Sequence, residues 1–129
     1  MNIAKKIGSL LGEIVSHPTG ASYIFEKGGT KVVVRPGGDY SGTDLSGLNL
    51  KGLNLRGTNF QGANLSKVDF SGAHLEDSDL TNATLIGTVL SGAHLEGAKF
   101  DPDGLIQAVL ESTPSGLSPG LAKRMKSEV

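Results

Sequence analysis

A large apolar side chain recurs at every fifth residue through the middle of the chain. This spacing fits neither regular element. Five residues advance a helix by about 500°, so the side chains would circle its axis, and five residues along a straight strand reverse the face. The pattern therefore predicts a chain that turns once per pentapeptide. Its thirteen positions are Tyr40, Leu45, Leu50, Leu55, Phe60, Leu65, Phe70, Leu75, Leu80, Leu85, Leu90, Leu95 and Phe100.

The other positions of each pentapeptide supply the turn and the interior space. Gly stands two residues after the large side chain in nine of the thirteen repeats. Asp77 and Asn82 at this position also tolerate positive φ, whereas Lys67 departs from the pattern. The residue two before the large one is mostly small, apart from Leu48 and Leu53, and the residue directly before it is mostly Asp or Asn. Each repeat is predicted to be a short extended piece followed by a bend.

These repeats resemble those of the pentapeptide-repeat family, and Gly62-Ala63-Asn64-Leu65-Ser66 is among the clearest. The resemblance covers residues 38–102. It implies an all-β solenoid, a right-handed quadrilateral parallel β-helix with four repeats per coil and about three coils in total. Leu48 and Leu53 fall in the first coil, so we expect them to pack against an N-terminal cap.

Residues 1–37 are predicted to form that cap. Two β-prone runs flank Gly28-Gly29, which predicts a β-hairpin over residues 23–34. The preceding segment is predicted to be an amphipathic helix that ends before His17-Pro18. This helix could cover the first coil, form a dimer interface or lie on a membrane surface, the last being least favoured because only Lys5 and Lys6 add positive charge. The apolar residues on its predicted face are Ile3, Ile7, Leu10, Leu11, Ile14 and Val15.

Residues 103–129 are predicted to close the other end. Asp103 can cap a short helix that runs through Leu110 and ends near Thr113-Pro114. The segment 115–120 has the composition of a linker, and residues 121–129 are expected to form a flexible tail or a marginal short helix.

Composition narrows the classes of function. The net charge of −1 creates no field that favours nucleic acid or membrane, so we expect neither as a direct partner. The chain has no cysteine, hence no disulfide framework and no thiolate metal site. No stretch reaches the ~18 apolar residues needed to span a bilayer, and no convincing signal cleavage site is present. We expect a cytoplasmic protein, with export without a cleaved signal peptide as the alternative.

One pair of repeats suggests a metal site. The segments 71–76 and 91–96 are identical in sequence and twenty residues apart, which is one coil in the geometry that the resemblance implies. In that geometry His74 should lie over His94 and Glu76 over Glu96. Two imidazoles and two carboxylates could bind a divalent ion. The favoured interpretation is a solvated surface ladder, with Arg56 one coil from Glu76 as a charge pair of little weight. We therefore expect no metal ion and no cofactor.

The sequence gives little support for an enzyme. It has no HExxH motif and no Ser-His-Asp arrangement in a strand-turn-helix context. Carboxylates such as Asp69, Asp77 and Asp79 are expected on a regular outer surface, where the shifted pKa of a catalytic acid or base is not expected. No catalytic residue is predicted.

Ile86 and Val89 are the sharpest local anomaly, because they occupy outward positions that are polar in most other repeats. Such an apolar spot is usually covered. The cover could be the C-terminal segment of the chain, a second subunit in a homodimer, or nothing. Together with Ile7, Leu11 and Ile14, these residues form the candidate interaction surface.

Three functions remain open. The leading hypothesis is a protein-binding or scaffold module with an unidentified protein partner. The resemblance also suggests a DNA-mimicking inhibitor or protector of a type II topoisomerase, although the repeats carry a charge of only −3, from four bases and seven acids over residues 40–101. A secreted bacterial effector is the third hypothesis.

Overall fold

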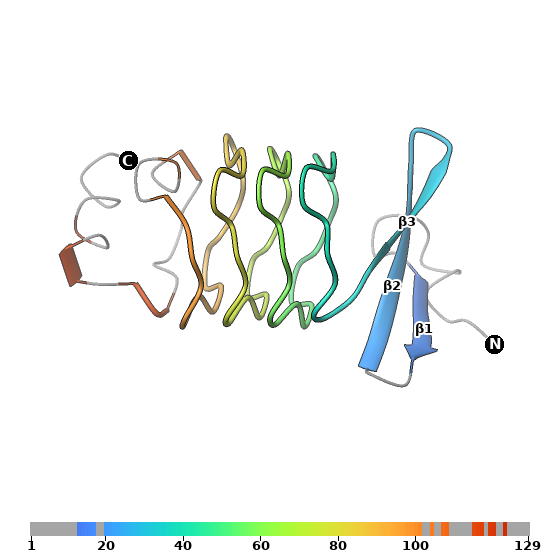
Figure 1. Cartoon of the computed structure of the whole chain (residues 1–129), viewed down its shortest axis with the longest axis horizontal. Coiled ribbons are helices and arrows are strands. Elements are labelled where there is room, and N and C mark those ends of the chain that lie inside the picture. The colour runs from blue at the N-terminus through green and yellow to red at the C-terminus, as the bar shows by residue number, and fades with distance from the viewer. Residues whose placement is uncertain are drawn as a thin grey trace.

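In the computed structural model, the described residues are 13–17, 20–101, 104, 107–108, 115–117, 119–120 and 123. Within this part of the chain, an antiparallel sheet stands at one end of a rod and the coils of a solenoid follow it (Figure 1). The chain passes directly from the last strand of the sheet into the first coil (Figure 1).

The sheet consists of β1 (Glu13–His17), β2 (Gly20–Lys27) and β3 (Thr30–Val34), in the order β1-β2-β3. Both neighbouring pairs are antiparallel. The predicted hairpin is confirmed, with β2 and β3 joined by Gly28 and Gly29 at φ values of 57° and 80°. Positive φ at both central residues is the backbone twist that a two-residue hairpin needs, and glycine adopts it without steric cost.

The predicted N-terminal helix is wrong for residues 13–17, which form strand β1. Ile14 pairs with Tyr23 and Val15 with Ser22 across the sheet. Both are β-branched residues, which are stiff in a helix and fit well on a pleated surface. Pairing with β2 therefore overrides the helical spacing of the apolar positions. Ile3, Ile7, Leu10 and Leu11 lie outside the described residues.

A β-helix-like solenoid follows, held by parallel bridges between residues twenty apart. The bridges include Asp39↔Asn59, Asp44↔Asn64, Asn49↔Asp69 and Asn54↔His74, so four pentapeptides separate each bridged pair. Backbone amides donate along this direction in every repeat; for example, Leu65 N–H donates to Thr84 O at 2.9 Å. The turn residues share one conformation whatever their identity: Lys67, Asp77 and Asn82 have φ values of 59–60°, close to the glycines.

The large residues fill the interior of the solenoid. Leu50, Leu55, Phe60, Leu65 and Phe70 are fully buried. The small positions complete the packing, and three of them carry buried hydroxyls that donate to carbonyls: Thr58 to Arg35 O (3.4 Å), Ser78 to Leu75 O (2.6 Å) and Thr88 to Leu65 O (2.7 Å). These bonds remove the cost of burying a hydroxyl without a partner.

The sheet closes the N-terminal end of this interior. Phe25 and Val34 are buried in the same apolar cluster as Leu48, as expected for a cap that covers the bulky first-coil residues. Lys27 Nζ donates to Ser46 O at 2.7 Å and lies 3.9 Å from Asp44 Oδ1. The hairpin is therefore joined to the first coil by both apolar packing and a polar contact.

At the C-terminal end, the segment predicted to be a linker extends the backbone ladder. Ser115 forms a parallel bridge with His94, and its carbonyl accepts the Leu95 N–H at 2.9 Å. Before this segment, Gln107 O accepts the Gly87 N–H at 3.3 Å. Most of the predicted C-terminal helix lies outside the described residues. The linker prediction was wrong because composition does not reveal a pairing partner 21 residues away.

None of the helical segments within the described residues has the length and hydropathy to cross a membrane.

Candidate functional site

The polar residue before each large one usually stabilises the following bend. Its side-chain oxygen accepts the backbone N–H two residues ahead, a local turn typical of Asp and Asn. Asn64 does so to Ser66 at 3.1 Å and Asp69 to Ser71 at 2.9 Å. The pattern of the repeats marks these residues only as polar, although the recurrence of Asp and Asn at one fixed position is the signal for this turn. The same bond forms at Asp39, Asp44, Asn49, Asn54, Asn59 and Asp79.

These bonds also set the charge state of the carboxylates. A backbone hydrogen bond from Ser41 lowers the pKa of Asp39, and hydrogen bonds from Ser46 lower that of Asp44. A carboxylate whose pKa is lowered stays ionised near neutral pH and is a poor proton donor. Asp39 and Asp44 thus serve as turn acceptors, and their environment is opposite to that of a general acid.

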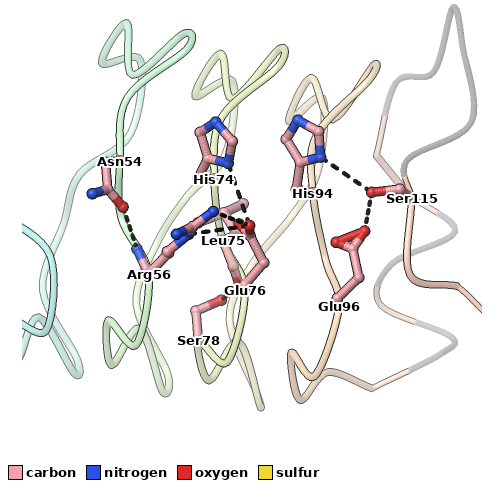
Figure 2. A network of polar contacts seen from close by, with 9 residues as sticks. All are labelled: Asn54, Arg56, His74, Leu75, Glu76, Ser78, His94, Glu96 and Ser115. Atoms are coloured by element: carbon pink, nitrogen blue, oxygen red, sulfur yellow. Dashed lines mark hydrogen bonds and ion pairs between the residues drawn. The ribbon is translucent and has the colours of Figure 1, made fainter.

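A concentrated group of ionisable side chains lies on the face that carries His74 and His94 (Figure 2). As predicted, His74 lies over His94: their backbones form a bridge, and their rings stack with centroids 4.4 Å apart and planes 7° apart. Arg56 also contacts Glu76 as predicted, with Nη2 and Nε at 2.8 and 3.1 Å from Oε2. We call Arg56, His74, Glu76, His94 and Glu96 the histidine face.

The two carboxylates of the histidine face have different neighbours, although they stand in identical segments. Glu76 Oε2 lies 3.3 Å from His74 Nδ1 in addition to its contacts with Arg56. Glu96 Oε1 instead accepts a hydrogen bond from the Ser115 hydroxyl, whose Oγ also lies 3.3 Å from His94 Nδ1 (Figure 2). Sequence reasoning missed Ser115, because its approach depends on the C-terminal segment returning to the last coil.

Glu76 is the best-anchored acid of this face. Burial raises the pKa of Glu76, but hydrogen bonds from its own backbone N–H, from Arg56 and from His74, together with the Arg56 charge, outweigh burial. The net effect lowers the pKa of Glu76 below its ordinary value of 4.5. Its side chain is only 19% exposed, so Glu76 is held as a carboxylate against the coil.

The histidine face does not have the geometry of a metal site. Because the two imidazole planes are nearly parallel, their nitrogen lone pairs run side by side, whereas a tetrahedral ion needs ligands that converge at about 2.0–2.2 Å. Each Nδ1 also faces its own partner, Glu76 or Ser115. Among the residues that the structure describes, no group of three metal-binding side chains is close enough to hold an ion.

Ile86 is the most exposed large apolar side chain among the described residues, at 58%. Its equivalents one and two coils earlier are Ser66 and Ser46. Val89 is partly buried and pairs with Asp69 through its backbone. Of the other proposed surface residues, Ile14 lies in β1 and pairs with Tyr23, whereas Ile7 and Leu11 lie outside the described residues.

Val33 of β3 is the other exposed large apolar residue in this part of the chain, at 46%. The sequence analysis did not single it out, because Val32-Val33-Val34 reads as a uniform apolar run. Successive side chains of a strand point to opposite faces of the sheet. Because Val34 faces the core, Val33 must face away from it.

Comparison with known proteins agrees with the repeat architecture. The family described as Pentapeptide repeats (8 copies) matches residues 41–77 and 78–101. The chain belongs to the pentapeptide-repeat family. No curated protein matches the chain.

Several solved pentapeptide-repeat proteins resemble the chain. Rfr23 from the cyanobacterium Cyanothece 51142 is 31% identical, with 57% of each chain covered and a TM-score of 0.35. HetL from Nostoc sp. strain PCC 7120, involved in heterocyst differentiation regulation, is 30% identical over 55% of this chain and 35% of its own, with a TM-score of 0.33. A further pentapeptide-repeat protein from Nostoc PCC 7120 is 30% identical over 65% and 72%, with a TM-score of 0.29. The chain thus spans just over half of the first relative and about a third of the second.

Proposed function

We propose that this pentapeptide-repeat protein is a non-enzymatic protein-binding module that contacts its partner through the surface around Ile86. The observation that carries the proposal is the 58% exposure of an isoleucine at a position held by serine in the two preceding coils. An exposed apolar side chain surrounded by polar ones is the usual composition of a protein contact.

The backbone around Ile86 supports this role. Ile86 O accepts the Lys67 N–H at 3.1 Å, and the next amide, Gly87 N–H, donates to Gln107 O at 3.3 Å. The side chain is therefore presented from a backbone anchored on both sides. Less conformational freedom is lost when such a preorganised residue is buried by a partner.

The chemistry of the surface favours binding over catalysis. Asp39, Asp44 and Asp79 accept turn hydrogen bonds that lower the pKa of each carboxyl. The rings of His74 and His94 stack against each other, and each Nδ1 faces an oxygen of its own neighbour. The Ser115 hydroxyl, which lies 3.3 Å from His94 Nδ1, donates to Glu96, so these contacts organise the surface.

The test is to compare Ile86→Lys with Ser66→Lys, which adds the same charge at the equivalent site one coil earlier. Partners would be captured by crosslinking to the full chain and then measured again with purified components. We expect Ile86→Lys to weaken binding by about tenfold or more, and Ser66→Lys to leave it within about twofold. Equal affinity for wild type and Ile86→Lys would reject this surface.

Topoisomerase inhibition by DNA mimicry is less well supported. Mimicry needs a continuous negative field, but two of the acids here are paired with bases, in the contacts of Lys27 with Asp44 and of Arg56 with Glu76. Inhibition of gyrase supercoiling by the purified chain would favour mimicry over the binding module proposed here.

A further inference from the structure

Among the residues that the structure describes, nothing pairs with the outer edge of strand β3 in the N-terminal sheet. In the order β1-β2-β3, strand β3 pairs with β2 on one side only. Val33 on this strand is 46% exposed, and Lys31 is exposed as well. This surface is separate from Ile86 and does not depend on the function proposed above.

The phase of the hairpin shows which backbone groups face the open edge. Lys27 and Thr30 flank the two-residue turn and therefore form a hydrogen-bonded pair, and such pairs alternate along an antiparallel ladder. Phe25↔Val32 and Tyr23↔Val34 are then also bonded pairs. The N–H and C=O groups of Lys31 and Val33 must point away from β2.

The register of β1 agrees with this phase. His17 and Gly20 flank the connection between β1 and β2, so Ser22 and Ile24 of β2 bond to β1 while its odd-numbered residues bond to β3. Among the described residues, no other backbone group bonds to Lys31 or Val33. Lys31 and Val33 lie two residues apart in β3. Their backbone N–H and C=O groups are thus unpaired among the described residues.

The side chains leave this edge poorly protected. Edge strands are commonly blunted by a charged residue or a proline. The charge within β3 is Lys31, which stands directly opposite Glu26 of β2, so the two charges offset each other. Val33 stands opposite Ile24, giving the outer face of the hairpin an apolar pair.

We propose that β3 pairs antiparallel with β3 of a second copy of this chain, joining two sheets into one. With the two-fold axis at Val32, Lys31 of each copy faces Val33 of the other, and each facing pair exchanges both N–H···O=C bonds. No like charges stand opposite each other in this register, and the aliphatic stem of Lys31 covers Val33.

A second copy fits this edge better than an unrelated strand. In the register centred on Val32, the backbone groups of both Lys31 and Val33 are hydrogen-bonded, and Val33 of each copy packs against the aliphatic part of Lys31 of the other. The net charge of −1 adds little general repulsion between copies. The strand contact alone is small, so we expect weak association, with a Kd on the order of hundreds of micromolar.

The test is sedimentation velocity on the full chain from about 10 µM to about 1 mM, compared across three variants. Val33→Pro removes an outward N–H that makes no bond within the sheet. Val33→Lys keeps that N–H but places lysine opposite Lys31 of the second copy. Ile86→Lys is the control, because it alters the other exposed apolar residue. Circular dichroism melts establish that each variant is folded.

We expect a concentration-dependent dimer for wild type and Ile86→Lys, and at least about tenfold weaker association for both Val33 variants. Hydrogen exchange at Lys31 and Val33 should slow as the wild-type concentration rises. Val33→Lys carries the test if Val33→Pro does not fold. A wild-type monomer throughout the range, or dimers of folded Val33 variants as tight as wild type, would overturn the proposal.

Discussion

At the scale of single residues, position within the repeat decides what a polar side chain does. Asp and Asn before the large residue accept a backbone amide two residues ahead, whereas His74 and His94 at the same position stack on each other. Asn, Asp and His are all polar, but only the short side chains close the local turn. The histidines are therefore free to interact between coils.

Glu76 should make the stability of the protein depend on pH. Its pKa is lower in the folded chain than its ordinary value, so its contribution is present above that value and is lost as pH falls through the folded pKa. We expect Glu76→Gln to lower the melting temperature by about 2–4 °C at neutral pH. The difference from wild type should shrink below pH 4.5. Melts that differ equally at pH 7 and pH 3 would show that Glu76 acts through packing alone.

At the scale of elements, the sequence predicts best where structure is set locally. Glycine at a fixed position demands a bend in each repeat, and the twenty-residue period placed Arg56 against Glu76 and His74 against His94. Prediction failed where pairing with another segment decided the conformation. Ile14 and Val15 fit a helical period but pair with β2, and Ser115 joins the last coil.

Gly116 is the residue that allows the last of these pairings. Its φ is +85°, and a Cβ built there would lie 2.4 Å from Glu96 N. Gly116→Ala should therefore release residues 115–117 from the last coil, because both the backbone conformation and the contact disfavour a side chain. The Leu95 amide, which donates to Ser115 O, should lose protection from hydrogen exchange by about tenfold or more.

Gly57→Ala is the matched control for this change. Gly57 has a similar φ of +66°, but a Cβ there meets nothing within 4 Å. It should strain its own turn and leave the Leu95 amide protected. Unchanged Leu95 exchange in Gly116→Ala would mean that the terminal segment tolerates the added methyl group.

At the scale of the whole molecule, the sheet and the solenoid share one apolar interior. Tyr23, Phe25 and Val34 of the sheet belong to the same buried cluster as the leucines of the coils. A solenoid end without such a cover exposes unpaired backbone groups and apolar side chains. The sheet therefore packs as one body with the coils, although it lies outside the repeats.

Deletion of residues 1–37 should convert the protein into an aggregating fragment. The deletion uncovers Leu48, now 8% exposed, together with the fully buried side chains beneath the sheet. Phe25→Ala is a milder change for comparison, because it keeps the sheet and removes only its most buried ring. It should lower the free energy of unfolding by about 3–5 kcal/mol while the chain stays soluble. Light scattering and thermal melts distinguish the two. A monomeric 38–129 fragment that melts at the wild-type temperature would show that the coils are stable without the sheet.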